Sequence, residues 1–158
     1  MPPSMIPSYG NTFMRSKRMR KIQWDESLSI GVPLIDDQHK KWIQCLADVT
    51  AAVELVQGPQ RIAEAIGFLL DYTRTHFATE EKAMADNQYA GLADHQAKHE
   101  QLRKTLADLE DEYKEEGATH ILAESIGNFM ANWLVTHIKE VDLKFGSFLR
   151  EKGVVLAL

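Results

Sequence analysis

Apolar residues recur at steps of three and four through most of the chain, the spacing that turns one face of an α-helix toward a core. Four such runs extend over residues 35–56, 62–84, 92–113 and 122–141, separated by short polar turns. No window alternates apolar and polar residues as a half-buried strand would. Because short connections make successive helices antiparallel, the pattern predicts an all-α, up-down-up-down four-helix bundle.

The residues between the runs match the signals that end and begin helices. Gly58 closes the first run and Pro59 opens the second, in the order that helix ends and starts favour. Gly117 follows the third run, and Thr119 is placed to cap the fourth. Residues 24–36 lack the helical period, so we expect an N-terminal loop packed on the bundle through Trp24 and Ile30. Apolar residues at 145, 148 and 149 predict a short C-terminal continuation.

Length and composition indicate one domain with a sizeable core. The chain has 158 residues, of which 44% are hydrophobic. A net charge of −5 argues against a general nucleic-acid binder. A membrane span needs about 20 consecutive apolar residues, far more than any run here, so no span is expected. The single cysteine, Cys45, excludes an intrachain disulfide and a cysteine-based zinc ribbon, and with no secretory signal it favours the reducing cytoplasm.

Charge is unevenly distributed along the chain. Residues 1–23 hold five basic residues and no acidic one, which leaves 13 basic against 23 acidic residues in the remainder. We therefore expect residues 1–21 to form a basic N-terminal arm outside the fold, residues 22–152 to form the bundle, and residues 153–158 to form a C-terminal tail. A transit peptide is the alternative interpretation of the arm.

Five of the six histidines lie on or beside the apolar faces of the predicted helices. One core histidine is usually a structural residue, but five in one bundle must each find a hydrogen-bond partner or a metal. The apolar residues around them offer few partners, so a shared metal is the simplest solution. The five are His39, His76, His95, His99 and His137.

The spacing of these residues supports a shared site. His76 and Glu80 are four apart, as are His95 and His99, so the members of each pair differ by about 40° around an ideal helix and face one way. The zinc-protease pattern His-Glu-x-x-His is excluded because Gln96 follows His95.

Asp142 stands five residues after His137, about 140° round an ideal helix. Both side chains face inward if they straddle the core-facing line, or if a local wide turn intervenes. Five imidazoles and one or two carboxylates exceed a four-coordinate zinc site and suit two metal ions bridged by carboxylates. In an antiparallel bundle all these residues fall at the same end.

These residues resemble the hemerythrin family, in its bacterial branch. The resemblance covers about residues 22–150 and implies a four-helix bundle around a non-heme di-iron centre that binds O2 reversibly. The matching elements are Trp24 through Gly31 before Ile35-Asp36-Asp37-Gln38-His39, then His76-Phe77-Ala78-Thr79-Glu80-Glu81 with Met84, Tyr89 before His95-Gln96-Ala97-Lys98-His99, and His137-Ile138 followed by Asp142.

The resemblance also implies a role for each candidate. One iron would keep an open position for O2, beside apolar residues that resemble the family's pocket. Phe145 is a departure, because family members often carry tyrosine there. The implied assignment is His95, His99 and His137 on one iron, His39 and His76 on the other, Glu80 and Asp142 bridging together with an oxo or hydroxo group, and Leu134, Ile138 and Trp133 at the O2 pocket.

The expected function is therefore reversible O2 binding for storage, delivery or scavenging, using two iron ions that alternate between Fe2+ and Fe3+, rather than an enzyme activity. The Glu-x-x-His pairs of ferritin-like oxidases are missing from the sequence. Two alternatives remain open. The open metal position also suits a di-iron peroxidase or nitric-oxide-handling enzyme, and the basic arm suits an O2 or redox sensor that acts through a partner.

Overall fold

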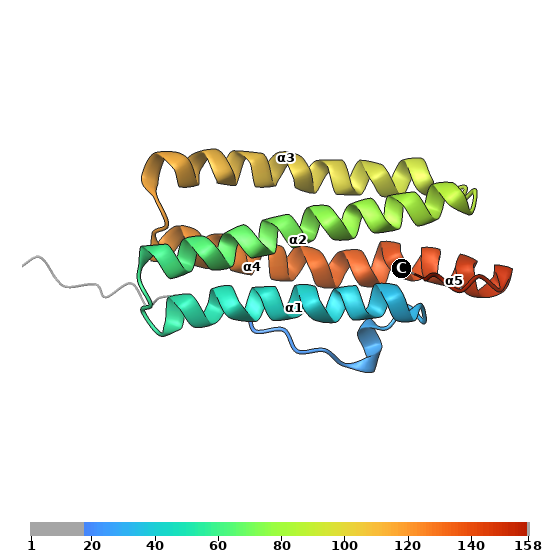
Figure 1. The fold of residues 1–158 in the computed structure, drawn as a ribbon, viewed down its shortest axis with the longest axis horizontal. Coiled ribbons are helices and arrows are strands. Elements are labelled where there is room, and N and C mark those ends of the chain that lie inside the picture. Colours follow the sequence, from blue (N-terminus) through green and yellow to red (C-terminus); the bar gives the residue numbers. More distant parts are fainter. Residues whose placement is uncertain (1–17, 158) are drawn as a thin grey trace, which may run out of the picture.

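Four long antiparallel helices form the molecule, and all of the structure described here is helix, turn or loop (Figure 1). The structure is a computed structural model that describes residues 18–157. The four-helix bundle is confirmed, with α4 continued by a π-helix and a final short helix. The elements are η1 (Glu26–Leu28), α1 (Pro33–Glu54), α2 (Pro59–Asp86), α3 (Leu92–Glu116), α4 (His120–His137), the π-helix η2 (Ile138–Asp142) and α5 (Leu143–Lys152).

The predicted helix boundaries have clear local causes. The Thr119 side chain accepts a hydrogen bond from the Leu122 backbone N–H at 3.1 Å, which confirms it as the cap of α4. Gly58 precedes α2 with a φ of 90°, a conformation that favours glycine, and Pro59 is the first residue of α2. Because these signals end α1 and begin α2 within a few residues, the connection is short, and α1 and α2 lie antiparallel and side by side (Figure 1).

The N-terminal loop is fastened to the bundle end where α1 begins and α5 ends. The Asp36 carboxylate in the first turn of α1 accepts hydrogen bonds from the Ile30 N–H at 2.8 Å and from the Ser29 hydroxyl at 2.6 Å. The Arg150 guanidinium donates to the Ile30 carbonyl from α5. Ile30 is completely buried as a result, as the sequence predicted.

Residues 19–21 pack against the bundle, although the sequence suggested an arm up to residue 21. Met19 is 6% exposed and lies over Gly127, and the Arg20 N–H donates to the Asn128 side chain at 2.6 Å. Lys21 pairs with Glu54 at 2.8 Å. Met19 therefore belongs to the folded unit, because it fills a hollow left by a glycine. The rest of the expected arm lies outside the described residues.

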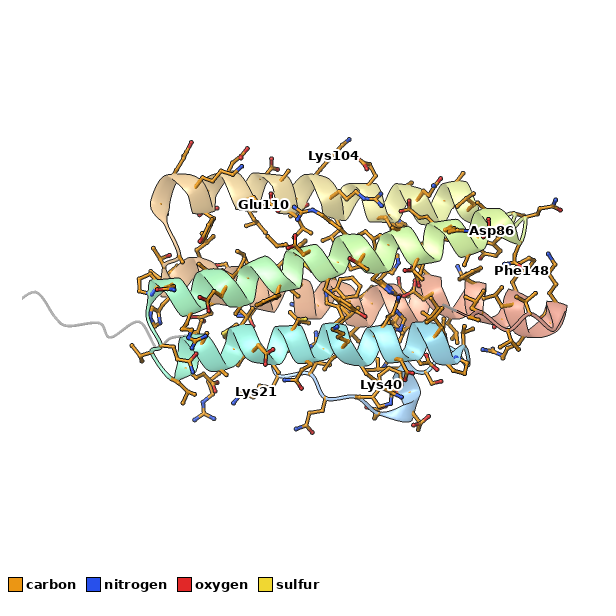
Figure 2. The ribbon with its side chains drawn as sticks, in the orientation of Figure 1. Lys21, Lys40, Asp86, Lys104, Glu110 and Phe148 are labelled. Atoms are coloured by element: carbon orange, nitrogen blue, oxygen red, sulfur yellow. The ribbon has the colours of Figure 1, made fainter. Side chains whose placement is uncertain are left out.

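The interior changes character along the bundle. Apolar side chains fill the half that contains the α1–α2 and α3–α4 connections, and polar groups accumulate toward the other half. Near the surface, Glu110 of α3 reaches toward α2 and pairs with Arg74 (Figure 2). Buried Thr50 and Thr73 satisfy their hydroxyls on backbone carbonyls four residues earlier, so they need no other partner. None of the described helices is long and apolar enough to cross a membrane.

Two glycines offer a matched test of packing between α5 and the N-terminal loop. A Cβ on Gly146 would stand 2.4 Å from the Ile30 carbonyl oxygen, whereas a Cβ on the exposed Gly67 of α2 would meet nothing within 4 Å. We expect Gly146→Ala to destabilise the fold by about 1–3 kcal/mol through overpacking. Gly67→Ala should stabilise it by roughly 0.5–1 kcal/mol. Chemical denaturation measures both, and equal effects would contradict the close loop contact.

Candidate metal centre

Seven buried polar residues from all four long helices and the π-helix meet at one end of the bundle. The start of α1, the end of α2, the start of α3 and the end of α4 lie at that end, on the right in Figure 1. Each of the seven is at most 3% exposed. The structure thus brings together every candidate from the sequence, namely His39, His76, Glu80, His95, His99, His137 and Asp142.

The seven residues form two donor groups that share their carboxylates. In each group, one ligand atom from every member lies within 4.8 Å of the others. The first group has three imidazoles and the second has two, and both contain Glu80 and Asp142. The groups are Glu80, His95, His99, His137 and Asp142, and His39, His76, Glu80 and Asp142.

The carboxylates point one oxygen toward each group. Glu80 Oε2 lies 3.3 Å from the Nε2 atoms of His95 and His99. Its other oxygen, Oε1, lies 3.5 Å from His76 Nε2. Asp142 does the same, with Oδ1 at 2.9 Å from His137 Nε2 and Oδ2 at 3.0 Å from His39 Nε2. Such an arrangement suits two carboxylates that each join two cations.

The three-histidine group has the spacing of a metal face. His137 Nε2 lies 3.1 Å from His99 Nε2 and 3.2 Å from His95 Nε2. Metal–nitrogen bonds are about 2.1 Å long, so two nitrogens bound at right angles to one ion are about 3.0 Å apart. The three imidazoles therefore converge on a common point.

Unsatisfied atoms give an independent test of fit. Buried side-chain nitrogens and oxygens normally have hydrogen-bond partners. Among the described residues, the buried atoms without such a partner include both oxygens of Glu80, both of Asp142, and the Nε2 atoms of His39 and His76. Unpaired carboxylates in an apolar interior are costly unless a cation compensates them. The residues present therefore fit a pair of metal ions.

A local change of helix type explains how His137 and Asp142 face the same way. Residues 138–142 form a π-helix rather than an α-helix, and His137 just before it and Asp142 at its end are both buried. The wider turn adds a residue to the helix without rotating the following side chain out of the core. This confirms the wide turn that the five-residue spacing allowed.

Two neighbouring residues, which the sequence analysis did not assign, orient the imidazoles from outside. The Nδ1–H of His76 donates to Gln38 Oε1 at 2.8 Å, and the Gln38 amide donates in turn to Thr79 Oγ1 at 3.2 Å. The Nδ1–H of His99 donates to Glu81 Oε1 at 2.8 Å. These bonds fix the tautomer that leaves Nε2 free to bind a metal. Two sequence signals point to Gln38 and Glu81: each flanks a candidate ligand, and each lies in a segment that resembles the family.

Aromatic rings enclose the cluster on its inner side. Phe77 stacks on His99 with ring centroids 3.7 Å apart, and Trp133 stacks on His137 at 4.2 Å. Trp42 packs against His76 at 5.1 Å and is completely buried, and its indole N–H has no partner among the described residues. The predicted pocket residues Leu134 and Ile138 are at most 1% exposed.

Phe145, the departure from the family pattern, is completely buried beside the cluster. Its ring centroid lies 6.4 Å from that of His95 and 5.2 Å from that of Tyr89. Phe145 therefore contributes packing and has no hydroxyl group to donate a hydrogen bond. Its neighbour Tyr89, in the α2–α3 connection, does carry a hydroxyl group and is partly buried.

Proton binding balances the buried carboxylates when no metal is bound. Burial lowers the pKa of His95, but the carboxylates of Asp142 and Glu80, at 3.1 and 3.3 Å from His95 Nε2, outweigh burial and raise the pKa of His95 to about 9. Burial in turn lowers the pKa of His76 to about 4. The surrounding imidazoles outweigh burial and hold the pKa values of Glu80 and Asp142 below their ordinary range.

These pKa values predict that metal and protons compete. A group with a raised pKa stays protonated until the pH passes that pKa, so metal-free His95 carries a proton at pH 7 that a metal must displace. We expect apparent Fe2+ affinity to rise between pH 6 and 9, by up to about tenfold per pH unit for each displaced proton. Anaerobic Fe2+ titration in weak buffer with an indicator dye measures the release. Affinity independent of pH over this range would refute the competition.

Comparison with known proteins places this geometry in a family. The family model described as Hemerythrin HHE cation binding domain matches residues 30–149. A bacteriohemerythrin from Stenotrophomonas maltophilia is 30% identical over 124 residues, 78% of each chain, and a myohemerythrin from Sipunculus nudus is 29% identical over 126 residues, 77% of this chain and 88% of that protein. A crystal structure of wild-type hemerythrin aligns with a TM-score of 0.71 and 28% identity over 80% of this chain and 95% of that one. The chain therefore belongs to the hemerythrin family.

Proposed function

We propose that this chain binds O2 reversibly at a non-heme di-iron centre. The observation that carries the proposal is the inequality of the two donor groups, which share two carboxylates but have three imidazoles on one side and two on the other. Membership of the hemerythrin family supports iron as the metal and O2 as the ligand.

Counting donors identifies where O2 would bind. Three imidazoles and two shared carboxylates would supply five ligands to one iron. His39 and His76 with the same carboxylates would supply only four to the other, one fewer. We therefore assign the open position to the iron held by His39 and His76.

The chain's own residues suit carrying O2 rather than oxidising a substrate. When bound, a pair of irons supplies two electrons to O2 and recovers them on release. One ligand group has three neutral imidazoles and two carboxylates, and the other has two of each. This small number of carboxylates limits the negative charge that would stabilise higher oxidation states of iron. Buried Leu134, Ile138 and Trp42 exclude water from the inner side, which slows irreversible loss of electrons.

An enzyme that cleaves peroxide needs a proton donor or acceptor beyond the ligands. Among residues 18–157, the buried carboxyl and hydroxyl groups outside the seven candidates are those of Asp36, Thr50 and Thr73, and all three make structural hydrogen bonds. This favours a binding protein over a peroxidase. We further propose a cytoplasmic location, since Cys45 is a free cysteine.

Removing one proposed ligand should remove the metal. We expect His76→Ala to lose most of the iron and to lower the unfolding temperature, because ligation and folding are coupled. His120→Ala changes a histidine at the start of α4, at the opposite bundle end, and should retain two irons per chain. Iron analysis and thermal unfolding measure both effects. Full iron content in His76→Ala would contradict the assignment of His76.

Reversibility separates a carrier from an oxidase. We expect the reduced, iron-loaded protein to gain visible absorption on exposure to air and to lose it again under vacuum, over repeated cycles. The measurement is an optical spectrum in a sealed cell, followed by iron analysis to show that the metal is retained. Oxidation in a single irreversible step, without a recoverable reduced form, would exclude reversible O2 binding.

A further inference from the structure

The two proposed metal positions differ outside their ligands as well as in number of ligands. On the two-histidine side, His76 donates to the neutral amide oxygen of Gln38 at 2.8 Å. On the three-histidine side, His99 donates to the carboxylate of Glu81, also at 2.8 Å. The two hydrogen bonds have the same length, but the acceptor is a neutral amide in one and a carboxylate in the other.

Glu81 is held firmly in this position. Arg103 Nη2 donates to the same Oε1 atom at 2.6 Å, and the Glu81 side chain is only 19% exposed. The Arg103 guanidinium lies 5.3 Å from the centre of the Phe77 ring, which itself stacks on His99. The guanidinium and the carboxylate therefore form a partly buried ion pair beside His99.

A carboxylate that accepts the outer N–H of a metal-bound imidazole does two things. It fixes the tautomer and ring orientation, and it makes the inner nitrogen a stronger donor. Its negative charge also favours the more positive oxidation state of a nearby metal, because opposite charges attract strongly in a poorly solvated interior. The Gln38 amide can do the first of these but supplies no net charge.

We propose that Glu81 is a positioning residue that orients His99 and lowers the reduction potential of the three-histidine iron, with Arg103 moderating the effect through its positive charge. This deepens the proposed function and rests on its di-iron centre. The iron without an open position is thereby the more easily oxidised of the two, whereas the outer partner of His76, on the iron facing O2, is the neutral amide of Gln38.

Two charge changes with opposite signs test the proposal. Glu81→Gln keeps an acceptor oxygen for His99 and removes the negative charge, so the midpoint potential of the iron-loaded protein should rise. Arg103→Gln keeps a donor for Glu81 and removes the positive charge, so the potential should fall. Spectroelectrochemistry under argon measures both, alongside iron content. Glu100→Gln is the control, because that carboxylate is 55% exposed and 3.6 Å from Arg103, and should leave the potential unchanged.

A third variant tests orientation. Glu81→Ala removes the acceptor and should lower iron affinity about 10- to 100-fold. Glu81→Gln should recover most of that loss, because its carbonyl oxygen still accepts from His99. If the iron affinity of Glu81→Gln were no higher than that of Glu81→Ala, the orienting role would be overturned.

The outcomes separate this inference from the proposed function. Equal potentials in Glu81→Gln, Arg103→Gln and the unchanged protein, each with two irons, overturn the tuning role alone. Shifts in the same direction also overturn it, since they indicate general disruption. If Glu81→Gln does not bind iron, the Arg103→Gln variant decides alone: a lower midpoint potential supports the tuning role, and a higher or unchanged one overturns it. Opposite shifts in a protein that does not release O2 would support the tuning role and refute the carrier function. A chain that binds no iron refutes both.

Discussion

Two carboxylates buried face to face within a ring of imidazoles are the constraint on which the rest of the structure depends. Glu80 and Asp142 are completely buried, and each directs one oxygen toward each donor group. Such charges are strongly unfavourable in an apolar interior unless positive charge neutralises them. Protons on the histidines provide part of it in the metal-free chain, and two cations fit the same atoms. The first requirement of the site is therefore positive charge, from protons or metal ions, that neutralises Glu80 and Asp142.

The bundle places these charged groups together with almost entirely regular helices. Helices hold the ligands on a rigid frame, and antiparallel packing brings the start of one helix level with the end of the next (Figure 1). One irregularity was needed, the π-turn that carries Asp142 back into the core after His137. The N-terminal loop packs at the same end, where hydrogen bonds with Asp36 and Arg150 hold Ile30 in place.

The residues around the ligands make the two halves of the site unlike each other. Stacked rings of Phe77 and Trp133 cover imidazoles of the three-histidine group, and Trp42 covers His76. Anionic Glu81 supports one half and neutral Gln38 the other. Unequal ligand number and unequal outer charge both distinguish the iron that would meet O2 from the iron that would only share electrons. Reversible O2 binding requires electrons to pass to O2 and return, and these differences would let one iron bind O2 while the other only supplies an electron.

By itself, the sequence determined the four helices, because their apolar spacing repeats over many residues, and the seven clustered side chains, because each falls on an inward face at a matching depth. Local signals such as Pro59 and Thr119 were also sufficient, since caps act within a turn. Only the tertiary structure decided the contacts of Met19, Gln38, Glu81 and Arg103. Those contacts join residues from separate elements, or depend on the direction of a flexible side chain, and neither leaves a periodic trace along the chain.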